Sequence, residues 1–212
     1  MKWWMSILCV FLLAGCTTVS ERIELGNQNY PSAPTDIYLI PMEGISVEFA
    51  ASISQEIESR YKLATKVLTT MGRETSMFNT EHRQYSANRI AQRAHEIIAA
   101  IKRPEEQPFI LVLTPYDINT EDFQLRFLFA AHFKEIAHFN GVSVISTARI
   151  DPVNYGLPRD NKLRDDRLMK LINKAIGQQV LHIPISSDSK SAMYGPILGL
   201  DDLDSMSSAL NK

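Results

Sequence analysis

Cysteine is nearly absent from this chain of 212 residues, and both cysteines, Cys9 and Cys16, lie close to the N-terminus. The rest of the chain can therefore form neither an internal disulfide nor a thiolate metal site. An excess of charge of one sign is also missing, because 22 basic and 24 acidic residues give a formal net charge of −2. Without a basic excess, we expect no nucleic-acid partner.

The motifs of several common enzymes are missing as well. The sequence has no G-x-G-x-x-G or phosphate-binding loop, and no serine has the G-x-S-x-G context of a serine hydrolase. Its histidines include no two that are four residues apart, so no helix of this chain can carry the zinc motif H-E-x-x-H. They stand at positions 82, 95, 132, 138 and 182.

A short hydrophobic run at residues 7–15 is what the N-terminus does contain, with Lys2 as the one charge ahead of it. The run is about half as long as a membrane span, and polar sequence follows it. This pattern predicts a secretory signal peptide over residues 1–15. An alternative interpretation is an ordinary secretory signal peptide in which the cysteine after the run, Cys16, has no role in processing.

The end of the signal, Leu13-Ala14-Gly15-Cys16, resembles the lipobox of bacterial lipoproteins. The resemblance implies that Cys16 is acylated and anchors the chain in a lipid bilayer. Thr17 follows rather than Asp, which implies the outer membrane, facing the periplasm. We expect the lipidated cysteine and a polar, flexible tether over residues 16–35, and a single folded domain over residues 36–212.

The domain alternates β-branched apolar runs with apolar residues at helical spacing. The run at 109–113 is almost continuously apolar, which predicts a central strand buried on both faces. The pattern predicts an α/β (α+β) domain with helices packed on a twisted mixed sheet. The expected strands are 37–41, 67–68, 109–113, 125–129 and 142–146, and the expected helices are 46–63, 86–102 and 161–181.

The second half of the chain carries a recognisable order of motifs. LTPYDI at 113–118 is followed by FLF at 127–129, by VISTAR at 144–149 with Tyr155-Gly156, and by PISSDSKSAMY at 184–194. This order resembles the archaemetzincins, which are zinc-peptidase-like proteins of the metzincin clan. The resemblance implies a zincin-like fold in which a long C-terminal helix leads to a segment like the methionine turn, with Met193 as its methionine.

The same resemblance locates the positions of the zinc site. Active metzincins carry HExxHxxGxxH, in which histidines bind Zn²⁺ and the glutamate is the general base. Placing Met193 at the turn puts Ala175, Gln179 and Ile185 at the three ligand positions and Ile176 at the general base. We therefore expect a degenerate site with no catalytic residues and no cofactor.

Weaker candidates for an atypical metal site remain in His132, Glu135, His138 and His182. The segment that begins at Lys134 copies the H-E-x-x-H spacing with lysine in place of the first histidine. A protonated lysine repels a cation, so we expect this segment to be a surface loop or short helix.

Together these patterns predict a lipid-anchored protein of the cell envelope, held through acylated Cys16. Its degenerate metallopeptidase-like domain would bind or scaffold a protein or peptide partner without catalysis. Two alternatives stay open. One is a zinc-dependent metallopeptidase with an atypical metal site, and the other is a structural envelope lipoprotein unrelated to peptidases.

Overall fold

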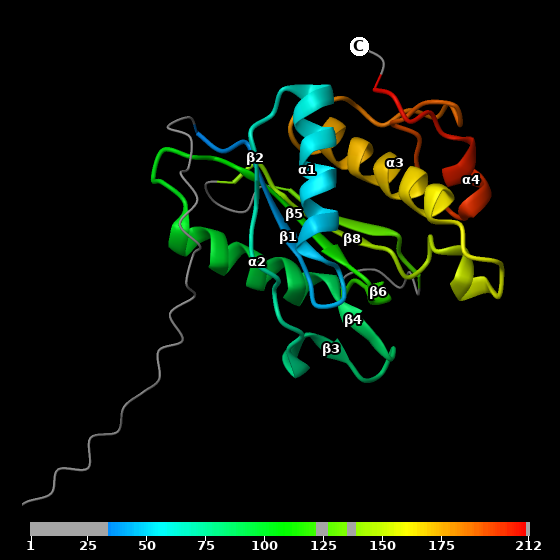
Figure 1. Cartoon of the computed structure of the whole chain (residues 1–212), viewed down its shortest axis with the longest axis horizontal. Helices are drawn as coiled ribbons and strands as arrows, with labels where there is room; N and C mark the ends of the chain where they lie inside the picture. The colour runs from blue at the N-terminus through cyan, green and yellow to red at the C-terminus, as the bar shows by residue number, and fades with distance from the viewer. Residues whose placement is uncertain (1–33, 122–126, 135–138, 211–212) are drawn as a thin grey trace, which may run out of the picture. The chain divides into compact units, whose positions relative to one another are not determined.

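The computed structural model describes residues 34–121, 127–134 and 139–210. A twisted five-stranded sheet forms the centre of the domain, with the strand order β2-β1-β5-β8-β7 (Figure 1). Strands β2, β1, β5 and β8 are parallel, and β7 runs antiparallel to β8 at the end of the sheet. The strands are β1 (Ile37–Pro41), β2 (Thr65–Val67), β5 (Phe109–Thr114), β7 (Ala130–Phe133) and β8 (Val142–Ser146).

Long helices cover both faces of this sheet, with α1 and α3 on one face and α2 on the other. Alternate side chains of each strand point to opposite faces, so Ile37 and Leu39 pack toward α1 and α3, whereas Tyr38 and Ile40 pack toward α2. The helices are α1 (Val47–Tyr61), α2 (Ala87–Ile101) and α3 (Asn161–Gln179).

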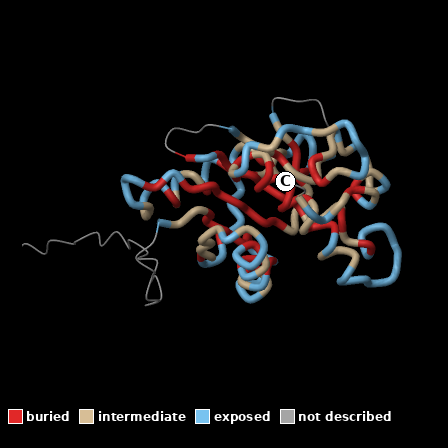
Figure 2. Tube along the Cα trace, turned by 90° about the horizontal axis from the view of Figure 1, so that it is seen from above, coloured by how far each residue is buried: buried red, intermediate tan, exposed pale blue. Residues whose placement is uncertain are grey.

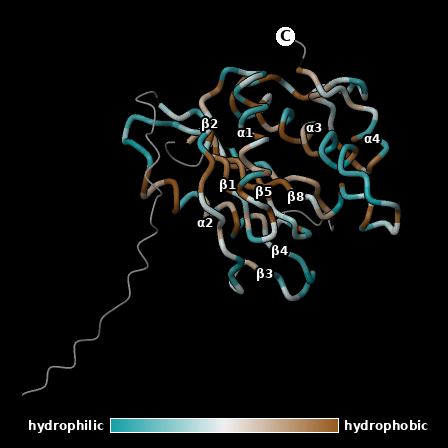
Figure 3. The backbone as a smooth tube through the Cα atoms, in the orientation of Figure 1, coloured by the Kyte–Doolittle hydropathy of each residue, from teal (hydrophilic) through white to brown (hydrophobic). Residues whose placement is uncertain are grey.

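The core follows the central strands. Buried residues concentrate between the helical layers (Figure 2), and hydrophobic residues follow β1, β5 and β8 (Figure 3). Because helices cover both faces, β5 is buried along its whole length, as the apolar run at 109–113 predicts. Within the residues described, no helix combines the length and the apolar character needed to cross a membrane.

The predicted fold class is confirmed, and one predicted strand is wrong. The expected strand at 125–129 is not present in its described part, where Leu128 makes only a single bridge to Ile118. The edge strand begins instead at Ala130. Residues 127–129 are apolar because they line a cavity, so their composition resembles that of a strand without strand pairing.

A second, three-stranded sheet was not predicted, because its strands are too short to show an alternating pattern. Its order is β3-β4-β6, and an edge-to-face contact between Phe78 and Tyr85 joins two of its strands. Its strands are β3 (Phe78–Asn79), β4 (Gln84–Ser86) and β6 (Ile118–Asn119). The remaining short elements are η1 (Thr75–Met77), η2 (Pro152–Tyr155) and α4 (Leu200–Ser205).

After α3 the chain turns back and packs against the same helix. His182 adopts a left-handed backbone conformation with φ 52°, and the amide of Ile183 donates to the carbonyl of Gly177 at 2.8 Å. Met193 then lies buried against α3, where a Cβ added to Gly177 would be 2.5 Å from its sulfur. A side chain at position 177 would have to displace Met193, so glycine allows the C-terminal segment to pack closely against the helix.

Candidate functional site

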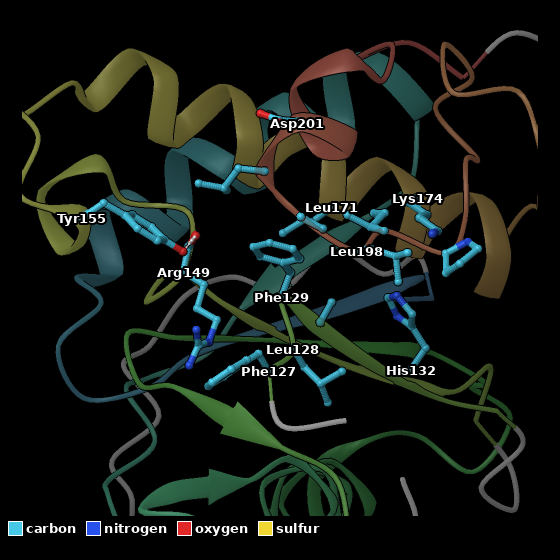
Figure 4. Close-up of a pocket in the computed structure, with 15 residues that line it drawn as sticks. Phe127, Leu128, Phe129, His132, Arg149, Tyr155, Leu171, Lys174, Leu198 and Asp201 are labelled. Carbon is cyan, nitrogen blue, oxygen red and sulfur yellow. Dashed lines mark hydrogen bonds between the residues drawn. The ribbon is translucent and has the colours of Figure 1, made fainter. Parts of the chain in front are cut away.

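The main cavity of the described residues has a volume of about 700 Å³ and lies at the edge of the sheet. One wall consists of residues 127–130 and His132, which lead into and form β7, and the opposite wall consists of α3 and residues 196–201. Figure 4 shows the aromatic and aliphatic side chains between two polar ends. His132 and Lys174 lie at one end, and Arg149 and Tyr155 lie at the other.

Lys174 provides the charge at the first end. Its side chain comes from the middle of α3 and is 8% exposed, and its ammonium donates to the carbonyl of Tyr194 at 2.6 Å. No carboxylate among the described residues forms an ion pair with it. Burial lowers the pKa of Lys174 below its usual range because desolvation disfavours the charged form.

His132 lies beside this lysine on β7. Its Nδ1 is 2.8 Å from the hydroxyl oxygen of Ser143, a fully buried residue on the neighbouring strand β8. Burial lowers the pKa of His132 from 6.5 to about 4, and the positive charge of Lys174 acts in the same direction. The imidazole is therefore neutral at pH 7.

Arg149 provides the charge at the second end, and this charge is compensated. Its guanidinium donates to both carboxylate oxygens of Asp117, one of them at 2.6 Å, and stacks 3.8 Å from the ring centroid of Phe127. The hydroxyl of Tyr155 donates to the Arg149 carbonyl at 3.0 Å. A bidentate ion pair of this kind fixes the arginine in place and neutralises it.

The positions expected for the zinc ligands lie in different surroundings. Ala175 and Ile176 are fully buried in the core between α3 and the sheet, and Gln179 is buried against Gly141. Ile185 follows the helix and is 57% exposed. The assignment of these residues to a former zinc site stays a prediction.

Two α3 residues, Leu171 and Lys174, line the cavity, and the polar one, Lys174, lies one position before Ala175. Met193, the predicted methionine-turn residue, is buried beneath the same helix. A shift of one residue would therefore put the lysine ammonium where the resemblance expects the first zinc ligand.

The weaker metal candidates are not brought together among the described residues. His132 lines the cavity, whereas His182 is exposed beyond the end of α3. Glu135 and His138 lie outside the described residues, as does Cys16. Within residues 34–121, 127–134 and 139–210, no group of three or more His, Cys, Asp or Glu side chains could hold a metal ion.

The donor set of the cavity does not fit a zinc ion. Structural and catalytic zinc sites use three or four neutral imidazole, thiolate or carboxylate ligands. Here a single imidazole, His132, lies beside the Lys174 ammonium, and the Asp117 carboxylate is already paired with Arg149. We therefore derive no chemistry that depends on a metal at this place.

Sequence reasoning missed Lys174 and Arg149, which line the cavity, and Ser143, which contacts the cavity residue His132. A signal existed for the first, because Lys174 interrupts the apolar face of the last long helix between Leu171 and Ala175. Ser143 similarly interrupts the apolar run of 142–146. A charge or hydroxyl in an apolar stripe indicates a polar contact inside the fold.

No protein-family model and no curated protein matches this sequence. Solved structures do resemble the fold. A zinc-dependent peptidase from Methanocorpusculum labreanum has a TM-score of 0.65 and 19% identity, with 82% of this chain and 95% of that chain covered. The archaemetzincin from Archaeoglobus fulgidus, solved with malonate, has a TM-score of 0.62 and 19% identity, with 84% and 96% covered.

The archaemetzincin from Methanopyrus kandleri gives a TM-score of 0.60 at 15% identity, with 86% of this chain and 92% of that chain covered. The chain therefore has the fold of the archaemetzincin-like zinc peptidases. At these identities the likeness extends to the fold, and the activity of the relatives is a separate question.

Proposed function

We propose that this chain is a lipid-anchored protein of the cell envelope whose metallopeptidase-like domain binds a peptide without hydrolysing it. The observation that supports this proposal is the position of Lys174, an ammonium that is buried at the cavity and has no carboxylate partner within residues 34–121, 127–134 and 139–210. A cation at this position opposes zinc binding by charge repulsion and favours an anionic ligand instead.

The shape of the cavity supports a binding role. A volume of about 700 Å³ lies within the range of ligand sites, and apolar side chains with a few polar groups line it. Among the described residues β7 is the last strand of its sheet, and it borders this cavity, so an extended peptide could pair with the main-chain groups of its outer edge. Strand addition of this kind is a common mode of peptide recognition.

The test of the binding role begins with metal and catalysis. The whole chain, purified in detergent, is incubated with zinc and desalted, and bound metal is measured together with the melting temperature with and without a chelator. We expect substoichiometric zinc, no chelator-induced change in melting temperature and no cleavage of casein. One tightly bound zinc per chain, or cleavage that a chelator abolishes, would favour the zinc-dependent hydrolase instead.

The proposed anchor is tested separately. Cys16→Ser removes the thiol that would be acylated, and Cys9→Ser is the matched control because that cysteine lies inside the proposed signal. After fractionation of cells, we expect the Cys9→Ser chain in the membrane pellet and the Cys16→Ser chain in the soluble fraction or unprocessed. Equal membrane retention, with equal mobility on a gel, would contradict lipidation at Cys16.

A further inference from the structure

The two polar ends of the cavity differ in their charge balance. At one end Asp117 neutralises Arg149 through two hydrogen bonds. At the other end, the described acceptor for the Lys174 ammonium is the neutral carbonyl of Tyr194. The exposed Asp201 lies at the rim, well apart from Lys174 in Figure 4. Among the residues that the structure describes, no carboxylate compensates the positive charge at the Lys174 end of the cavity.

Solvent-exposed aromatic and aliphatic side chains line the cavity near both ends, with Phe127 and Tyr155 beside Arg149 and Leu198 near His132 and Lys174 (Figure 4). Phe127 is 58% exposed, Tyr155 is 49% exposed and Leu198 is 80% exposed, and all three line the cavity. Exposed large hydrophobic residues that gather at one concave site are typical of a binding surface. A ligand that covers them must have an apolar body, while its anionic group reaches Lys174.

The edge strand β7 favours a peptide as the ligand that carries this anionic group. Ala130 and His132 both line the cavity and alternate along β7 with Ala131, which packs on the opposite face of the sheet. A peptide that pairs with this edge would direct its side chains toward the exposed apolar residues. Its last residue would then bring a terminal carboxylate to the Lys174 end.

We propose that Lys174 binds the free C-terminal carboxylate of an apolar peptide that lies along β7. This inference rests on the peptide-binding role proposed above and adds the part of the peptide that is recognised. His132 supports the site as a neutral donor or acceptor, because Ser143 engages Nδ1 and no described residue engages Nε2. A hydrogen bond from an ammonium to a carboxylate is stronger than one between neutral groups.

The experiment compares two pools of acetylated pentapeptides built from Ala, Val, Leu and Phe. One pool ends in a free carboxylate and the other in an amide, and decanoate serves as an acyl-chain probe. Binding to the whole chain in detergent is measured by saturation-transfer NMR and by calorimetry. The variants are Lys174→Met, Lys174→Arg and the control Lys162→Met, which removes an exposed lysine of the same helix.

We expect the acid pool to bind the wild-type chain about 10- to 100-fold more tightly than the amide pool. Lys174→Met should abolish this preference, Lys174→Arg should keep part of it, and Lys162→Met should leave it unchanged. Equal affinity for both pools would overturn the carboxylate inference but leave peptide binding intact. Failure of both pools would overturn the peptide-binding role as well, and binding of decanoate alone would assign the site to an acyl chain.

Discussion

Each end of the cavity carries a cationic side chain, but the two side chains have different interaction partners. Arg149 is held by a bidentate carboxylate and an aromatic ring. Lys174 is more deeply buried, and its partner within the described part of the chain is a main-chain carbonyl. A paired cation is part of the scaffold, whereas an unpaired buried cation lowers stability unless a ligand supplies the missing charge. We therefore propose a structural role for Arg149 and a ligand-binding role for Lys174.

The largest expected effect is the response of the Lys174 end to acid. The folded-state pKa of His132 is about 4, below its unfolded value of 6.5, so between these values the unfolded chain holds one more proton. Stability is then lost as pH falls from 6.5 to 4, by about 3 kcal/mol at most. Urea unfolding at a series of pH values measures this loss.

Two variants decide whether His132 causes this acid response. His132→Gln should remove most of it, because glutamine does not titrate, while His82→Gln changes an exposed histidine and should leave it in place. If His132→Gln shows the wild-type pH profile, the imidazole is not held neutral by the fold, and the Lys174 end differs less from the Arg149 end than we infer.

The next largest effect concerns the Arg149 end. Asp117→Ala removes both hydrogen bonds to Arg149 and one from Gln84, all in partly buried surroundings. We expect a loss of about 2 kcal/mol in the free energy of unfolding. The matched control is Glu74→Ala, which breaks the exposed ion pair with Arg93 and should cost about 0.5 kcal/mol or less. Similar losses in both variants would mean that Asp117 and Arg149 are not a structural pair.

The smallest effect has the opposite sign. Lys174→Met removes a desolvated charge and one hydrogen bond to Tyr194, and the first of these dominates. We expect the free energy of unfolding at pH 7 to rise by about 1 kcal/mol. Lys162→Met, on the exposed side of α3, should change it little. Destabilisation by Lys174→Met would show that the lysine is retained for structure.

Most helices and strands of the central sheet could be predicted from the sequence, because the spacing of apolar residues indicates which positions are buried. The run at 109–113 and the stripe of the last helix predicted β5 and α3 closely. The edge strand was predicted at the wrong position because residues 127–129 are apolar and line a cavity. A short apolar run looks the same in the sequence whether it lines a cavity or pairs in a sheet.

The charge arrangement of the cavity was beyond sequence reasoning. His132 and Lys174 are 42 positions apart in the sequence. The fold brings β7 and α3 together, so that, besides burial, the charge of Lys174 lowers the pKa of His132. The partner of Arg149, Asp117, comes from a third region of the chain. These long-range contacts determine which cation has a carboxylate partner. They cannot be predicted from any single stretch of the sequence.

The most direct test of the account is the titration of Lys174 itself. The ¹³Cε chemical shift of this lysine is followed against pH by NMR, in the free chain and with the acid peptide pool bound. We predict a pKa below the usual lysine range in the free chain, because the ammonium is desolvated, and a rise in this pKa when the carboxylate binds. An ordinary pKa in the free chain that the peptides do not change would contradict it.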